Sequence, residues 1–148
     1  MSAPQAGRPW VGIHPGAGSE SKCAPAALFA AVARGVRERL GGTPVLIEGP
    51  DPIDGKALGR VLATSDIPFR VLSPGPLPEF VAFLRTLDAY VGNDSGATHL
   101  SALLGVPTTA LFGPTDPAVW GPVGARTRCL GGQPSGFAGI EPGDVWVP

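Results

Sequence analysis

The sequence predicts an α/β protein with one Rossmann-like parallel sheet and helices on both of its faces. Short apolar runs of strand length alternate along the chain with longer segments of helical periodicity. The 22 glycines and 18 prolines fall mostly between these segments. With 148 residues, 43% of them apolar, the chain has the size of one ordinary domain. Strands that alternate with helices favour a parallel sheet with right-handed crossovers.

The elements follow in order along the chain. "WVGIH" is typical of a buried strand, and "APAALFAAVARGVRERL" places Leu28, Phe29, Val32, Val36 and Leu40 near helical spacing. The same alternation predicts further strands in "PVLIE", "FRVL", "DAYVG", "TTALFG" and "TRCLGG". It predicts further helices at 54–64, in "PLPEFVAFLRTL" and in "SGATHLSALLG".

The remaining segments are expected to be irregular. Residues 1–9 are expected to form a disordered or linker segment, so the domain spans 10–148. A proline-rich loop is expected after "TTALFG", and the tail "QPSGFAGIEPGDVWVP" is expected to carry one short helical turn around Pro142 to Val145.

Composition excludes several classes of function. The net charge is −1 and only 16% of residues are charged, so the chain lacks the basic field that attracts nucleic acid. Cys23 and Cys129 show no metal-ligand spacing, and no cluster of carboxylates indicates a metal site. No apolar stretch approaches the roughly 18 residues of a membrane helix, and the start lacks a signal peptide's hydrophobic core. A cytoplasmic protein in a reducing compartment is therefore expected.

In open parallel sheets, ligands bind beyond the carboxyl ends of the strands. The first such loop, "HPGAGSESK", offers the backbone of Gly16, Gly18 and Ser19 and the charge of Lys22 to an anion. It is either a phosphate cradle or a flexible turn with a solvated lysine. It is not a Walker loop, and Ser21 stands where the dinucleotide fingerprint needs its third glycine.

The second loop, in "GNDSGATH", combines capping residues with a free backbone amide. Asp94 or Ser95 can cap the following helix, and Gly96 can offer its amide to a phosphate oxygen. Asp94 is either that cap or an acceptor for sugar hydroxyls, because a carboxylate repels a bare phosphate.

Ser95 and His99 are four residues apart on this helix, as a hydrolase pair would be. A serine hydrolase is nevertheless disfavoured, because Asn93 and Ala97 occupy the glycine positions of the nucleophile elbow. His99 is either a packed structural histidine or part of the ligand site.

Two further loops carry polar candidates. Glu48 ends a strand in "IEGPD", where a carboxylate commonly holds ribose hydroxyls, although a solvated loop carboxylate is the alternative. In "LFGPTDPAVWGPVG", prolines stiffen a loop that presents Thr115, Asp116 and Trp120 to a ligand. A rigid structural loop is the alternative there.

Three of these stretches, "HPGAGSESK", "EGPD" and "VGNDSGATHLSALLGVPTTALFGPTDPAVWGP", resemble the ADP-heptose:lipopolysaccharide heptosyltransferases, glycosyltransferase family nine. The resemblance runs from about residue 10 to residue 124. It implies a GT-B architecture of two Rossmann-like halves, of which this chain looks like the carboxy-terminal, donor-binding half. Ala24 departs from the family pattern, which usually has an aromatic residue there, and Ala97 and Thr98 replace a usual Pro-Met pair before His99.

The resemblance also implies roles for the candidate residues. Lys22 and the Ser19 region would contact a diphosphate, Glu48 the ribose, and Asp94 the sugar hydroxyls. The amides of Ser95 to Ala97 would hold a phosphate, and Gly16, Gly18, Gly96 and His99 complete the expected donor site. The expected ligand is ADP-heptose or a related nucleotide sugar, with no cofactor and no metal.

The acceptor, a glycan or a lipid-linked glycan, and the catalytic base belong to the family's amino-terminal half. No catalytic residue is therefore assigned to this chain, which is expected to bind donor without transferring it. The complete enzyme would be open to peripheral membrane association. Two alternatives stand beside this interpretation: a non-catalytic nucleotide-sugar-binding module or partner subunit, and, less favoured, a dinucleotide oxidoreductase.

Overall fold

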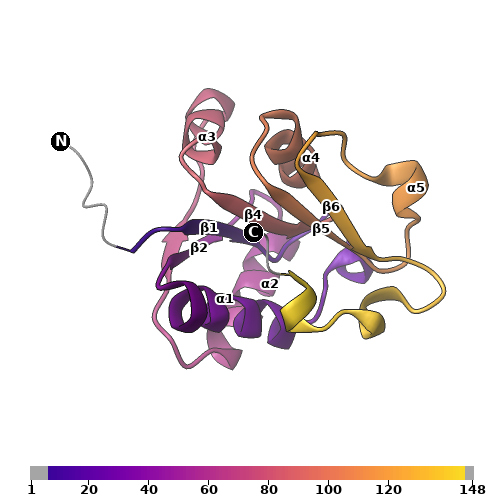
Figure 1. Ribbon diagram of the computed structural model, residues 1–148, viewed down its shortest axis with the longest axis horizontal. Helices are drawn as coiled ribbons and strands as arrows, with labels where there is room; N and C mark the ends of the chain where they lie inside the picture. The colour runs from indigo at the N-terminus through magenta and orange to yellow at the C-terminus, as the bar shows by residue number, and fades with distance from the viewer. Residues whose placement is uncertain (1–6, 146–148) are drawn as a thin grey trace.

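Six strands form one fully parallel sheet in the computed structural model, which describes residues 7–145 (Figure 1). The strands are β1 (Trp10–His14), β2 (Thr43–Ile47), β3 (Arg70–Leu72), β4 (Ala89–Asn93), β5 (Thr108–Phe112) and β6 (Thr127–Gly131). The helices are α1 (Ala26–Leu40), α2 (Pro52–Thr64), α3 (Leu77–Leu84), α4 (Gly96–Leu103) and α5 (Pro117–Trp120), with 3-10 turns η1 (Glu20–Lys22), η2 (Gly136–Gly139) and η3 (Pro142–Val145). The predicted Rossmann-like α/β class is confirmed.

The strand order β3-β2-β1-β4-β5-β6 places the first strand at the centre of the sheet. The chain builds outward from β1 through β2 to β3, then returns to the other side of β1 with β4. The order therefore reverses between β1 and β4, which end at His14 and Asn93. Such a switch point opens a crevice at the carboxyl ends of the strands, where ligands bind in this class of sheet.

Helices α1 and α2 cover one face of the sheet (Figure 1). On α1, Phe29, Val32 and Val36 are at most 1% exposed, and burying each side chain contributes about 1.5–3 kcal/mol. Leu40 keeps the predicted helical spacing, but its side chain is 42% exposed. It lies in the last turn, where Gly41, with a left-handed φ of 61°, ends the helix.

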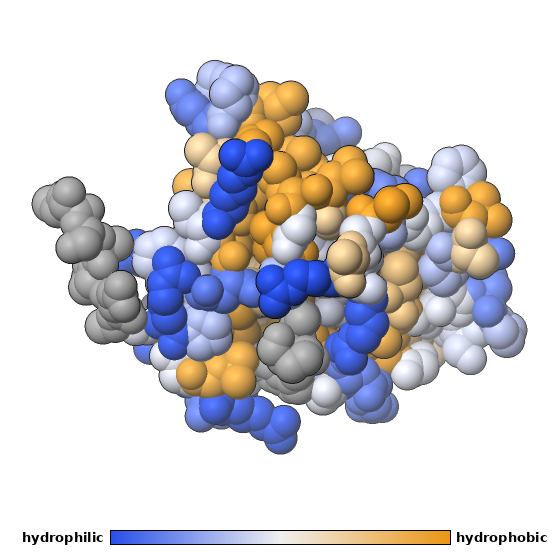
Figure 2. All heavy atoms as spheres, turned by 45° about the horizontal axis from the view of Figure 1, so that its top comes forward, coloured by the Kyte–Doolittle hydropathy of each residue, from blue (hydrophilic) through white to orange (hydrophobic). Residues whose placement is uncertain are grey.

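Helices α3 and α4 cover the opposite face over a smaller core of Leu84, Leu87 and Tyr90. Figure 2 shows apolar surface on this side of the molecule. Leu77 on α3 and Leu103 on α4 are 65% and 69% exposed. Within residues 7–145, no helix has both the length and the apolar character needed to cross a bilayer.

The expected loop after β5 contains the short helix α5. Asp116 caps it by accepting a hydrogen bond from the Ala118 amide at 2.9 Å, and Pro117 presets the first helical position. The predicted turn at Pro142 to Val145 is confirmed as η3, which packs on α1, but the tail carries a second short turn, η2, where only one was expected. Its last residues, 146–148, lie outside the described residues.

The expected linker at 1–9 lies outside the described residues as far as residue 6. Its described part contacts the domain. Thr43 Oγ1 donates to the Gly7 carbonyl at 2.7 Å, and Arg8 forms an ion pair with Asp88 at 2.7 Å.

Candidate functional site

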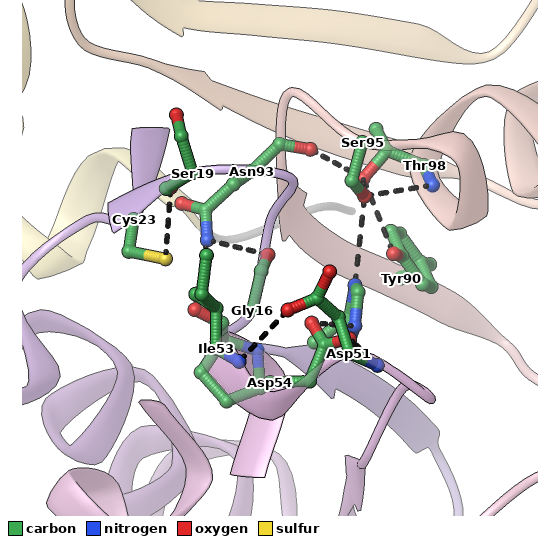
Figure 3. A network of polar contacts seen from close by, with 12 residues as sticks. Gly16, Ser19, Cys23, Asp51, Ile53, Asp54, Tyr90, Asn93, Ser95 and Thr98 are labelled. Atoms are coloured by element: carbon green, nitrogen blue, oxygen red, sulfur yellow. Dashed lines mark hydrogen bonds and ion pairs between the residues drawn. The ribbon is translucent and has the colours of Figure 1, made fainter. Parts of the chain in front are cut away.

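The buried side chain of Asn93 joins the two strand ends that flank the switch point. Its Nδ2 donates to the carbonyl oxygens of Pro15 at 2.9 Å and Gly16 at 3.0 Å (Figure 3). Its Oδ1 accepts a hydrogen bond from the Ala24 amide at 2.9 Å. The loop after β1 is therefore fixed to the end of β4. Sequence reasoning missed this role, because its only signal is a polar residue at a strand end.

Ser95, and not Asp94, is the cap of α4. Ser95 Oγ accepts a long hydrogen bond of 3.5 Å from the Thr98 amide and lies 3.2 Å from Thr98 Oγ1. The first amides of a helix have no partner within it and carry part of its positive dipole. A Cβ at Gly96 would meet nothing within 4 Å, so open space faces this end of the helix. The geometry suits an anion.

Asp94 is the centre of a polar cluster drawn from three loops. Its side chain is 9% exposed, and Thr115 Oγ1 donates to its Oδ2 at 3.1 Å. Lys22 Nζ lies 3.6 Å from the same oxygen, and His99 Nε2 lies 3.7 Å from Oδ1. The Lys22 and His99 side chains are 36% and 42% exposed, so the cluster opens to solvent. The structure thus brings together four of the residues predicted from sequence.

A pocket of about 430 Å³ lies beside this cluster, beyond the ends of β1, β2 and β3. That volume is in the range of small-molecule sites, which span about 300–1,000 Å³. Ser95, Gly96 and Ala97 form one wall of the pocket. Sequence reasoning did not single out the loop after β3, although Pro74 and Gly75 marked it as a turn. The other lining residues are His14, Ala17, Gly18, Ile47, Gly49, Pro50, Asp51, Asp54, Pro74, Gly75, Leu77 and Phe80.

His14 and Asp54 form a buried pair on the wall of this pocket, each 5% exposed. His14 Nε2 lies 3.4 Å from Asp54 Oδ1, while Asp54 Oδ2 accepts from the Asp51 amide at 3.0 Å in the capping box of α2 (Figure 3). Burial raises the pKa of Asp54, but interactions with His14 and the Asp51 amide outweigh burial and hold that pKa below its ordinary value. Asp54 is therefore a carboxylate at neutral pH.

Three predicted residues of the earlier loops differ in their placement. Gly18 lines the pocket, whereas Gly16 packs against Asp54: a Cβ there would overlap Asp54 Oδ1. Ser19 Oγ lies 3.1 Å from Ser21 Oγ, and the Ser19 carbonyl accepts from the Lys22 amide. Gly16 thus has a packing role in this structure that sequence reasoning did not foresee.

The remaining candidates lie outside the pocket lining. Glu48 is half-buried, and its Oε2 accepts a hydrogen bond from Ser73 Oγ at 3.2 Å. Asp116 is occupied as the cap of α5, and Trp120 is 58% exposed. Across residues 7–145, no three His, Cys, Asp or Glu side chains gather in an arrangement that would hold a metal ion.

The fold and the site together define a Rossmann-like domain whose pocket, helix N-terminus and Asp94 cluster meet at the switch point. A sequence model of glycosyltransferase family 9 (heptosyltransferase) matches residues 1–137. The chain belongs to glycosyltransferase family 9, as the resemblance predicted.

Known relatives agree with this assignment. Lipopolysaccharide heptosyltransferase 3 of Escherichia coli is 31% identical over 118 residues, which are 78% of this chain and 34% of that protein. The structure of the E. coli ADP-heptose lipopolysaccharide heptosyltransferase II superposes with a TM-score of 0.80 at 28% identity, covering 93% of this chain and 44% of that one. A family 9 glycosyl transferase from Veillonella parvula gives a TM-score of 0.74 at 28% identity, covering 87% and 36%.

An E. coli heptosyltransferase with ADP shares the fold, with a TM-score of 0.77 at 23% identity, covering 97% of this chain and 43% of that one. The chain therefore spans about a third of the curated relative and less than half of each of these solved structures. This coverage fits one part of a GT-B enzyme.

Proposed function

We propose that this chain is the donor-binding domain of a glycosyltransferase and that its donor is a nucleotide-diphosphate sugar, ADP-heptose or a close relative. The transferred sugar would go to a lipopolysaccharide-type or other glycan acceptor. The observation that carries the proposal is the spatial order of three neighbouring features at the switch point. These are the pocket, the start of α4 and the Asp94 cluster. A nucleoside, a diphosphate and a sugar occur in the same order in such a donor.

The nucleoside would occupy the pocket. Ile47, Leu77 and Phe80 supply apolar surface for a base, and Gly49 and Gly75 bring backbone close to it. Glu48 is proposed for the ribose, and it directly precedes the pocket residue Gly49 in the loop after β2. Its present partner, Ser73, would then have to yield to a ribose hydroxyl.

The diphosphate would lie at the start of α4. Gly96 and Ala97 line the pocket there, a Cβ at Gly96 would meet nothing within 4 Å, and Lys22 brings a full positive charge to the neighbouring Asp94. Charge builds on the diphosphate as the bond to the sugar breaks, and donors fixed in advance stabilise that charge. Lys22 and the helix start would do so without a metal.

Lys22→Ala is expected to weaken ADP binding by about 1.5–3 kcal/mol, because one charge-assisted contact is lost. That loss corresponds to about 10- to 150-fold in Kd. Binding of adenosine should not change, since it has no phosphate. Calorimetry with both ligands measures this, and Lys56→Ala, which removes an exposed lysine on α2, is the matched control. Equal ADP affinity in Lys22→Ala and the parent would contradict the diphosphate role.

The sugar would meet Asp94, whose carboxylate can accept hydrogen bonds from hydroxyl groups. Thr115 from the loop after β5, Lys22 from the segment after β1 and His99 from α4 surround this carboxylate. Because Ser95 caps α4, Asp94 has no capping duty, and its effects on binding report contacts with the sugar.

Asp94→Asn is expected to weaken binding of ADP-heptose by about tenfold and to leave ADP affinity within about twofold of the parent. The change removes the negative charge from an acceptor of sugar hydroxyls but keeps the size of the side chain. Competition calorimetry with the two ligands gives the ratio. Asp116→Asn is the control, because asparagine caps a helix as well as aspartate does. An equal loss for both ligands would show that the loop was disturbed.

Titration of the parent with ADP-heptose, ADP, adenosine and NAD tests the proposal as a whole. The expected affinities fall in the order ADP-heptose, ADP, adenosine. Tighter binding of NAD than of ADP would favour the dinucleotide oxidoreductase instead. No binding of any nucleotide would overturn the proposed function.

A further inference from the structure

The His14–Asp54 pair is more buried than its hydrogen bonding explains. The two side chains are 6% and 7% exposed, yet His14 Nε2 and Asp54 Oδ1 have no hydrogen-bond partner among the described residues. The two atoms lie 3.4 Å apart without forming a hydrogen bond. Buried polar atoms left without a hydrogen bond cost stability, so the pair is weak evidence for a structural role.

The pair connects the first turns of two helices across the pocket. Asp54 Oδ2 accepts from the Asp51 amide at the start of α2, and Oδ1 faces His14. On the other side of the ring, His14 Nδ1 lies 3.5 Å from Ser95 Oγ, the cap of α4. A change of charge on His14 therefore changes the electrostatic potential at the start of α4.

We propose that His14 is a positioning residue of the anion site at the start of α4, and that it takes up one proton when a diphosphate binds there. This inference rests on the proposed function. The ring lies between the Asp54 carboxylate and Ser95 at the helix start. A phosphate bound there would add negative charge on the Ser95 side, and a nearby negative charge favours the protonated form of an imidazole. The proton comes from solvent onto the imidazole, and no covalent bond in the ligand changes.

The other titratable groups near His14 are not expected to take up a proton when a diphosphate binds. Burial raises the pKa of the Tyr90 phenol on β4 far above its usual range, so Tyr90 stays neutral. Burial, and then the charge of Asp54, raise the pKa of the Cys23 thiol. Asp51 accepts a hydrogen bond from the Ile53 amide as the cap of α2. The other charged groups at the start of α4 are Lys22, Asp94 and His99.

Calorimetry of ADP binding at several pH values, in buffers of different ionisation enthalpy, measures proton uptake. The parent is expected to gain about tenfold in ADP affinity from pH 8 to pH 6 beyond the gain of His14→Gln, because an opposite charge nearby raises the pKa of a basic group by about one unit. Because ADP takes up its own protons equally in both experiments, the difference between the parent and His14→Gln leaves out the contribution of ADP protonation. Adenosine binding should show no such difference. Asp54→Asn should reduce the extra gain.

His99→Gln is the matched control, because the sequence holds only two histidines. The extra proton uptake should survive in this variant. Its single imidazole is then His14, whose proton NMR titration should move to higher pH when ADP is added. This second measurement does not require His14→Gln to fold.

The outcomes separate the two proposals. The inference is overturned if the parent binds ADP but the His14→Gln variant takes up as many protons as the parent. It is also overturned if the NMR titration of His14 does not change when ADP is added. In both cases the proposed function stands. If His99→Gln abolishes the uptake, the proton belongs to the Asp94 cluster, which also overturns the inference. A parent that binds no ADP at any pH overturns both.

Discussion

The 148-residue chain is expected to bind ADP-heptose and to transfer no heptose by itself. Its described residues supply the pocket, the helix start and the Asp94 cluster that we propose for the donor, while the resemblance places the acceptor and the base in the other half of the family's architecture. Holding donor, acceptor and base together supplies about 7–11 kcal/mol of a barrier reduction. Without that contribution the rate should be unmeasurable. Mass spectrometry of the acceptor after incubation with donor measures transfer.

Addition of an amino-terminal half from a family 9 relative, in trans or by fusion, is expected to restore transfer. We expect that half to dock on the side that bears the exposed side chains of Val119, Trp120 and Val123. The same amino-terminal half combined with the Lys22→Ala variant is the control, because a contaminating enzyme would transfer heptose regardless of this substitution. Transfer by the chain alone that disappears in Lys22→Ala would show that the catalytic residues lie within this chain. Donor binding without transfer in every combination would favour the non-catalytic module.

Gly16→Ala is expected to lower the free energy of unfolding by about 3 kcal/mol or more. A Cβ at this position would overlap Asp54 Oδ1 and would stand 2.9 Å from the Asp54 Cα. Neither group can move freely: Asn93 holds the Gly16 carbonyl, and Asp54 is fixed in the first turn of α2. Overpacking costs about 1–3 kcal/mol, and displacing the buried Asp54 from its hydrogen bond costs about 1–3 kcal/mol more. The melting temperature should fall by about 6–12 °C.

Gly18→Ala is the matched control in the same loop. A Cβ at Gly18 meets nothing within 4 Å, so its effect on stability should stay within about 1 kcal/mol. Urea unfolding of both variants and the parent gives the free energies. Equal stability of Gly16→Ala and Gly18→Ala would mean that the loop can move away from Asp54, contrary to the fixed contacts described above.

Much of the fold could be predicted from sequence because its signals are local. Strand and helix periods, and the glycine and proline residues between them, locate all six strands and the four longer helices to within a few residues. The exceptions depend on context. Helix α5 arises from a cap and a proline inside a stretch that looked irregular, and Leu40 keeps the helical spacing but lies at a helix end.

The candidate site was predicted less evenly. Lys22, Asp94, His99 and Thr115 converge, because the loops that carry them all leave the same edge of the sheet. The choice between Ser95 and Asp94 as the cap required coordinates, since both residue types favour that position.

The pair of His14 and Asp54 was missed for a different reason. The two residues lie 40 positions apart in the sequence, and Asp54 was predicted only as the start of a helix. Nothing in the local pattern indicates that its carboxylate turns back to the loop after β1. Contacts between distant segments of this kind follow from packing, which local periodicity does not encode.

The crowding around Asp54 also has a consequence for evolution within the family. A Cβ at Gly16 would overlap one carboxylate oxygen of Asp54, and a Cβ at Gly49 would overlap the other. A lineage that acquires a side chain at either glycine is therefore expected to replace Asp54 with a smaller residue in the same period of descent. In an alignment of close homologues, these three positions should change together, and ancestors reconstructed at such branch points should be stable only with matched sets. Substitution histories at positions 16, 49 and 54 are thus expected to be coupled.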